Sequence, residues 1–183
     1  MIRLALGLAL LGPASAPAGM PLSCDLGPAG APQVVTVVRT NAIVGSHVYY
    51  LRQGQAPSQP LFDGEAEESR GMAVRIGCAG RSRRVLALMG EFMSAGYPRG
   101  MVMVYDPDRR RFLRFNFAER NAPRWLYLGR KDALLVFPPG GRIETARHYL
   151  VYRFTPVEKQ DSTEEFERAR PSGRGYEVIE LRF

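Results

Sequence analysis

Histidine, cysteine and tryptophan are scarce in this chain, which holds two, two and one of them in 183 residues. Neither His47 nor His148 has a second ligand at metal-site spacing, because no H-x-x-x-H or H-E-x-x-H motif occurs. The Gly-x-Ser-x-Gly turn of α/β-hydrolases is absent, and the glycine-rich stretches match neither the Walker pattern nor G-x-G-x-x-G. These absences argue against a zinc enzyme, an α/β-hydrolase and a nucleotide enzyme, so we expect no metal, no cofactor and no catalytic residue set.

Lysine is also scarce, since Lys131 and Lys159 are the only two, and arginine supplies nearly all of the positive charge. The formal net charge is +7. A genome rich in G and C explains such an arginine excess without any function. The functional explanation is attraction to an anionic partner, such as a lipid headgroup, lipopolysaccharide, an acidic polysaccharide or an acidic protein surface.

No apolar run reaches the roughly 20 residues that a transmembrane helix needs. The apolar stretch from Leu4 to Leu11 is shorter, follows the positive charge of Arg3 and precedes small residues, which is the pattern of a secretory signal peptide. The alternative is a buried N-terminal helix, but Gly12 and Pro13 would end it after about two turns. We therefore expect a periplasmic or secreted protein with no transmembrane segment after cleavage.

Two cleavage positions compete at the end of this leader. Cleavage after Ala16 would leave Pro17 at the new N-terminus, which should suit a signal peptidase poorly. Cleavage after Ala18 leaves Gly19 and is the position that we expect. The signal peptide is then 1–18.

The two cysteines, Cys24 and Cys78, predict one disulfide, because an exported chain with an even cysteine count usually pairs them. The bond would close a loop of about 54 residues and stabilise the fold by roughly 4 kcal/mol. Two unpaired thiols are the alternative, with no C-x-x-C motif to support them, and lipidation of Cys24 is disfavoured because Pro21 stands where a lipobox has an aliphatic residue. The disulfide would tether a flexible lead-in at 19–33, rich in proline, glycine and alanine, to a single β domain at 34–183.

Short apolar or alternating segments, separated by turn residues, follow one another along the rest of the chain. They are 34–38, 48–51, 73–78, 84–89, 100–105, 112–117, 124–128, 133–137, 148–154 and 176–183. We expect an all-β fold, an antiparallel β-sandwich or open barrel of about nine to eleven strands. A β-propeller is the alternative, but no self-similar period appears and the chain has room for only two or three blades of about 40 residues.

One short C-terminal helix is expected over 161–169. Ser162 followed by Glu165 forms a capping box, and Pro171 would stop the helix soon after its last turn. This helix would be an exception in a chain whose other segments alternate with a period of two.

The densest aromatic and basic stretch predicts a β-hairpin over 101–117, with a turn that begins at Asp106 and Pro107. The basic tip of this hairpin, Arg109 to Arg111, is explained either as a solvated turn that protects the sheet edge from pairing or as an anion contact. Most aromatic side chains here should be core, but an exposed Trp or Tyr beside arginine would resemble a protein interface. The candidate partner or anion contacts are Arg109, Arg110, Arg111, Arg124, Trp125 and Tyr127.

Three functions are compatible with the sequence. The first is an exported, non-enzymatic binding or interaction module, whose partner is a protein or an anionic envelope component rather than a nucleic acid. The second is an inhibitor or immunity protein against a secreted enzyme or toxin, which rests on fold-level analogy. The third is a hydrolase that uses His47 or His148, because a catalytic triad can assemble from distant positions.

Overall fold

The computed structural model describes residues 22–40, 43–62, 64–93, 96–140, 148–155 and 162–183, and for 162–168 it describes the backbone alone. Within these ranges the chain forms thirteen strands and one turn of 3-10 helix. The first elements are β1 (Leu22–Asp25), β2 (Val34–Arg39), β3 (His47–Gln53), β4 (Gln59–Pro60), η1 (Glu67–Ser69), β5 (Arg70–Ala79) and β6 (Val85–Phe92). They are followed by β7 (Arg99–Asp106), β8 (Arg111–Ala118), β9 (Trp125–Leu128), β10 (Ala133–Phe137), β11 (Tyr149–Thr155), β12 (Ser162–Arg168) and β13 (Glu177–Glu180).

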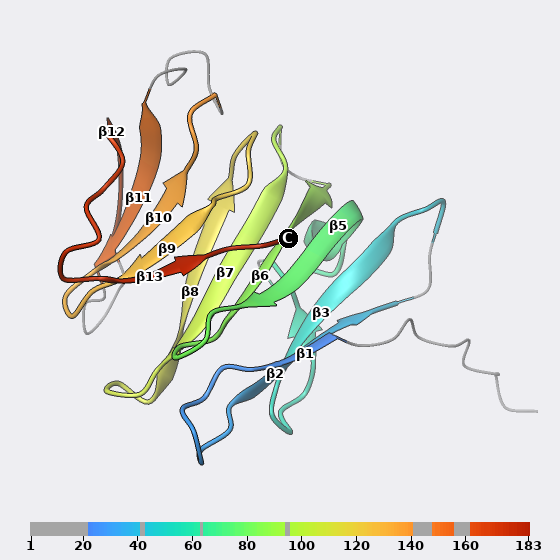
Figure 1. The fold of residues 1–183 in the computed structure, drawn as a ribbon. Helices are drawn as coiled ribbons and strands as arrows, with labels where there is room; N and C mark the ends of the chain where they lie inside the picture. The colour runs from blue at the N-terminus through green and yellow to red at the C-terminus, as the bar shows by residue number, and fades with distance from the viewer. Residues whose placement is uncertain (1–21, 41–42, 63, 94–95, 141–147, 156–161) are drawn as a thin grey trace, which may run out of the picture.

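The strands form two antiparallel sheets (Figure 1). The eight-stranded sheet has the order β1-β2-β3-β5-β6-β7-β8, with β4 paired to β3 outside this path, and the five-stranded sheet has the order β12-β11-β10-β9-β13. The expected all-β class, an antiparallel sandwich or open barrel, is confirmed. The strands that the alternation did not predict, β1, β4 and β12, lie at or beside sheet edges, where fewer neighbours impose a pattern on the sequence.

Strands β6 and β7 are buried on both faces, which explains their continuous apolar sequences. Val85, Ala87 and Met89 point into a core shared with the five-stranded sheet. Leu86 and Leu88 alternate with them and point into a second core, which β1–β3 close from the other side. Because full burial of such a side chain contributes roughly 1.5–3 kcal/mol, this middle layer organises the fold.

A bulge in β5 lets the eight-stranded sheet turn back over its own face. The pairing of β5 with β6 shifts register between Met72 and Arg75, and Ala73 has a positive φ of 52°. Before the bulge, Arg70 and Gly71 pair with β3, and after it β5 pairs with β6 alone. The bend brings β1–β3 over β6 and β7.

A disulfide spans this bend. Cys24 of β1 and Cys78 of β5 are bonded to each other, as expected, with their Cα atoms 6.0 Å apart and a sequence separation of 54. The two strands are not neighbours in the sheet, so the bond holds the turned-back part of the sheet against its centre.

Residues after β13 cross the eight-stranded sheet to reach β5 (Figure 1). The backbone oxygen of Arg182 lies so close to Gly77 that a Cβ at this position would clash with it. Leu181 joins the core between the sheets, so the last residues fasten one sheet to the other.

Two local expectations are corrected. The predicted helix at 161–169 is wrong, because Ser162–Arg168 forms β12 and its backbone pairs with β11 from Tyr149 to Thr155. Long-range pairing to the edge of a sheet thus outweighs a local capping signal. Part of the expected flexible lead-in, Leu22–Asp25, is ordered as β1 and pairs with β2.

The remaining terminal expectation, the signal peptide at 1–18, lies outside the described residues and stays a prediction. The described residues contain no helix that is long and apolar enough to cross a bilayer. The single β domain expected at 34–183 also stays a prediction.

Removing the disulfide should destabilise the protein by roughly 4 kcal/mol, because the bond closes a long loop in the unfolded chain. Urea unfolding of the Cys24→Ser/Cys78→Ser variant measures this loss, and alkylation mass spectrometry of the unreduced wild type should find no free thiol. Two labelled thiols in the unreduced protein, or an unchanged urea midpoint in the variant, would contradict the pairing.

The tip between β2 and β3 carries backbone strain that one substitution should relieve. Ile43 and Ser46 exchange two backbone hydrogen bonds of 2.8 and 3.0 Å, which makes Val44 and Gly45 the central residues of a two-residue turn with φ values of 49° and 78°. Such a turn favours Asn at its first central position, whereas a β-branched residue there is strained. We expect Val44→Asn to raise the free energy of unfolding by about 1 kcal/mol.

Val44→Thr is the matched control, because it removes the same exposed apolar side chain, 96% accessible, and keeps the β-branch. Urea unfolding should find no gain for it. Equal gains in both variants would show that exposure of an apolar group, and not backbone strain, sets the effect.

Candidate functional site

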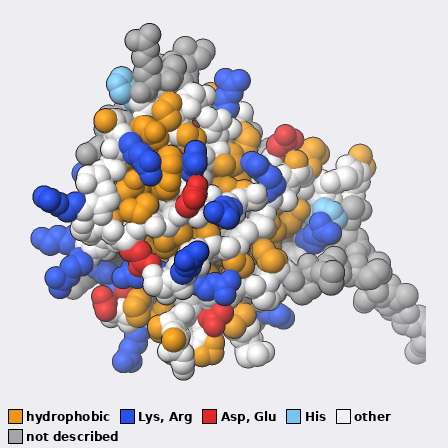
Figure 2. Space-filling model, viewed as in Figure 1, with side chains coloured by type: hydrophobic (Ala, Val, Ile, Leu, Met, Phe, Trp, Pro, Cys, Tyr) orange, Lys and Arg blue, Asp and Glu red, His pale blue; other side chains and the backbone are white. Residues whose placement is uncertain are grey.

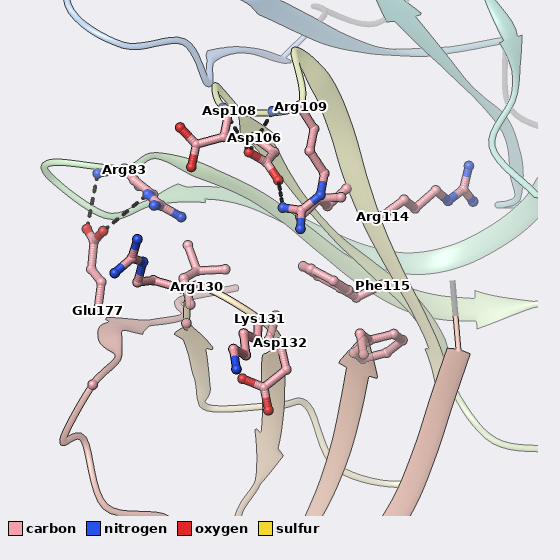
Figure 3. A pocket seen from close by; sticks show the side chains of 16 residues that line it. Arg83, Asp106, Asp108, Arg109, Arg114, Phe115, Arg130, Lys131, Asp132 and Glu177 are labelled. Atoms are coloured by element: carbon pink, nitrogen blue, oxygen red, sulfur yellow. Dashed lines mark hydrogen bonds and ion pairs between the residues drawn. The ribbon is translucent and has the colours of Figure 1, made fainter. Parts of the chain in front are cut away.

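A cleft of about 270 Å³ opens at one end of the space between the two sheets (Figure 3). Three hairpin turns meet there, those of β5–β6, β7–β8 and β9–β10, together with the residues that begin β13. The cleft is lined by Arg83, Asp106, Asp108, Arg109, Leu113, Arg114, Phe115, Leu128, Gly129, Arg130, Lys131, Asp132, Ala133, Phe154, Gly175 and Glu177. Ionisable side chains form its rim and apolar ones its floor.

The floor of the cleft is continuous with the core between the sheets. The rings of Phe115 and Phe154 are in contact, with their centroids 4.7 Å apart and their planes tilted by 51°. Leu128 and Ala133 belong to the same core, and the half-buried Leu113 packs against it. A ligand that entered the cleft would therefore meet an apolar surface below the charged rim.

On the β7–β8 turn, Asp106 organises the backbone and holds Arg109. Its Oδ1 accepts the backbone N–H groups of Asp108 and Arg109 at 3.0 and 3.2 Å, and its Oδ2 is 2.6 Å from the Arg109 guanidinium. Burial opposes ionisation of this carboxyl, but the hydrogen bonds and the charge of Arg109 outweigh it and hold the pKa of Asp106 below its usual value. The expected turn at Asp106 and Pro107 is present, and the charge of Arg109 is neutralised within it.

Glu177 neutralises a second cation of the rim. One of its oxygens is 3.4 Å from Nε of Arg83, and the other accepts the Arg83 backbone N–H at 3.2 Å and the hydroxyl of Ser82. These contacts tie the β5–β6 turn to the start of β13 (Figure 3). Arg83 is therefore held by a carboxylate from the opposite sheet.

Asp132 is engaged as well. The hydroxyl of Tyr176 donates to its carboxylate at 3.0 Å, and the Nε of Arg153 lies 3.3 Å from it. Its backbone oxygen accepts the N–H of Gly129 at 2.9 Å and so closes the β9–β10 turn. The side chain supports the turn and is not a free acid.

Arg130 and Lys131 occupy the tip of that turn. Both are exposed, and neither has an ion pair with any residue of the described chain. Arg114 also lines the cleft, but it extends away from the other basic side chains (Figure 3) and donates to the backbone oxygen of Leu61. The exposed Asp108 is the one acidic rim residue whose carboxylate has no bond within the described residues, so the uncompensated charge of the rim is positive.

The six residues predicted as contacts do not come together. Arg109 lies on the cleft rim, Arg110 is exposed at the turn with a φ of 51°, and Arg111 is half-buried at the start of β8. Arg124 lies elsewhere, 3.4 Å from Glu180. The predicted basic run is thus divided, and its first member is neutralised.

The two aromatic candidates, Trp125 and Tyr127, are not exposed in the structure. Trp125 and Tyr127 are 8% and 1% exposed, although their spacing places both on the outer face of the five-stranded sheet. Residues after β12 cover them, since Arg170 stacks 4.2 Å from the Trp125 ring and the hydroxyl of Tyr127 donates to the backbone oxygen of Pro171. Strand alternation does not reveal such a covering segment.

Neither histidine lines the cleft. His47 has its Nδ1 2.7 Å from the backbone oxygen of Thr40, and His148 is exposed just before β11. The described residues contain no group of three or more His, Cys, Asp or Glu side chains that could hold a metal ion. A hydrolase that uses either histidine gains no support from this cleft.

The distribution of charged side chains does not by itself identify a binding surface. Lys and Arg side chains spread over the face shown in Figure 2, with acidic and hydrophobic side chains between them. Comparison of the chain with protein-family models, curated proteins and solved structures finds no match. Among the described residues, the cleft between the three hairpin turns combines a charged rim with an apolar floor.

The sequence analysis missed Arg130 and Lys131, although it placed them between two expected strands at 124–128 and 133–137. A usable signal was the presence of two adjacent cations at a turn tip with a single acidic neighbour, Asp132, which can neutralise at most one of them. What the sequence does not show is that this turn meets those of β5–β6 and β7–β8 at the same end of the two sheets.

Replacing Asp106 with Asn should make stability less dependent on pH in acid. The pKa of the folded state lies below the unfolded value of about 3.9, so the carboxylate stabilises the fold above that value and the contribution is lost as pH falls through the folded pKa. We expect Asp106→Asn to cost about 1 kcal/mol near pH 7, a modest loss because Arg109 is 40% exposed and solvent screens the pair.

Urea unfolding between about pH 7 and pH 2 should show this difference shrinking below about pH 4. Glu180→Gln is the control, because it removes a carboxylate from an exposed pair in which the side chains are 58% and 47% accessible. A difference for Asp106→Asn that stayed constant over this range would contradict the electrostatic account.

Proposed function

We propose that this chain is an exported, non-enzymatic binding protein, and that its cleft holds an anionic group of the partner. The observation that carries the proposal is the pair Arg130 and Lys131. They stand exposed at the mouth of a cleft whose other cations already have oxygen partners. Uncompensated, exposed cations beside a concave apolar surface are the features of a site that selects an anion.

The chemistry of the rim favours a carboxylate or a phosphate. Arginine presents a planar fork that matches either group with two parallel hydrogen bonds, and lysine adds a compact point charge. Asp108 on the opposite turn would repel an anion that sat too far across the cleft. The anionic group would therefore bind on the side of the β9–β10 turn.

An inhibitor or immunity protein is the second candidate. It is favoured by the position of Arg130 and Lys131 on a turn tip, from which they can reach an acidic side chain on the surface of another protein. In both cases the same two cations make the contact, and export places the protein in the periplasm or outside the cell. The disulfide between Cys24 and Cys78 is compatible with that location.

The Arg130→Ala/Lys131→Ala variant tests the site. Titration with inorganic phosphate, followed by backbone amide shifts, should perturb Gly129, Arg130 and Lys131 in the wild type. The double variant should bind at least about tenfold more weakly, since hydrogen bonds to charged groups contribute roughly 1.5–3 kcal/mol. Added sodium chloride should weaken wild-type binding.

The control variant, Arg52→Ala/Arg120→Ala, removes the same charge from two exposed arginines outside the cleft. It should bind phosphate as the wild type does. Equal loss in both double variants would show that net charge alone attracts the anion, and no amide shifts in the wild type would refute the proposed site.

A further inference from the structure

We infer that the cleft takes a small single-chain amphiphile, with a carboxylate or phosphate head at Arg130 and Lys131 and an apolar tail against the floor. This inference rests on the proposed function, because it names the ligand class of the same site. The charge of the rim indicates the anionic head of the ligand, and the apolar floor indicates its tail. The described residues that line the cleft provide the contacts.

The apolar tail of the ligand is inferred from the apolar floor of the cleft. Leu113, Phe115 and Phe154 lie below the rim and are part of, or pack against, the core between the sheets. Phe115 and Phe154 are already 3% and 6% exposed, so the half-buried Leu113 supplies most of the apolar surface that a purely polar anion would leave in contact with water and that an apolar tail would cover. The floor therefore adds binding energy only for a ligand that carries an apolar part.

The anionic head of the ligand is inferred from the charges on the rim of the cleft. Arg83 and Arg109 are neutralised by Glu177 and Asp106, so they attract an anion weakly, and the remaining charge is concentrated on the β9–β10 turn. That turn also positions Leu128 and Ala133, which flank its two ends and lie on the floor. The polar and apolar subsites are therefore a few residues apart on one hairpin.

The size of the ligand follows from the cavity. Its volume is about 270 Å³. This is slightly below the usual range of about 300–1,000 Å³ for small-molecule sites. One short chain fits this space, and a two-chain phospholipid does not.

A series of alkyl phosphates tests the inference. Inorganic, ethyl, butyl, hexyl and octyl phosphate are titrated into the full mature protein below their micelle concentrations, with affinity measured by amide shifts. Affinity should rise about fourfold for each methylene that becomes fully buried, and then level off once the chain fills the cavity. A carboxylate series from butanoate to octanoate should show the same rise with a different head.

Two variants locate the tail. Leu113→Asn should abolish the rise with chain length and leave the affinity for inorganic phosphate unchanged. Leu22→Asn, at a half-buried leucine of β1 outside the cleft, should leave both unchanged. A rise that persisted in Leu113→Asn, or an equal loss for all ligands, would overturn the assignment of the floor.

The remaining outcomes separate the two proposals. Phosphate binding that depends on Arg130 and Lys131 but gains nothing from an alkyl chain would overturn the amphiphile and leave the anion site standing. Absence of any phosphate binding would remove both. Displacement of hexyl phosphate by phosphatidylglycerol vesicles would make a membrane surface the occupant and overturn the inference of a free amphiphile.

Discussion

Burial of β6 and β7 on both faces is the constraint on which the rest of the structure depends. One face is covered by the five-stranded sheet and the other by β1–β3, so the eight-stranded sheet has to turn back over itself. The bulge between Met72 and Arg75 provides the bend, and the Cys24–Cys78 bond holds it. The cleft lies at an end of the sandwich, where hairpin turns rather than strands border the core.

Much of this fold could be predicted from the sequence, because burial of one face of a strand makes apolar and polar residues alternate along it. The apolar runs from Val85 and Met101 and the alternation around Phe115 indicated strands, and two cysteines in a chain that was expected to be exported indicated one bond. The strand β12 could not be predicted, since its local capping signal favours a helix and only pairing with β11 overrides it. The turning back of β1–β3 also depends on contacts between residues far apart in the chain.

The candidate site was predicted less well, for a physical reason. A basic residue has the same appearance in a sequence whether or not a carboxylate neutralises it in the fold. Arg109 was expected to be available and is held by Asp106, whereas Arg130 was overlooked and has no counterion in the described chain. Trp125 shows the same limitation for an aromatic residue, because Arg170 and the residues after it cover its ring.

The most direct test of the central claim is a search for intermolecular nuclear Overhauser effects between the protein and bound hexyl phosphate. The account predicts contacts from the alkyl protons to the methyl groups of Leu113 and the rings of Phe115 and Phe154, with the phosphate near the Arg130 amide. Contacts confined to another surface, such as the exposed Ile43 and Val44, would contradict it.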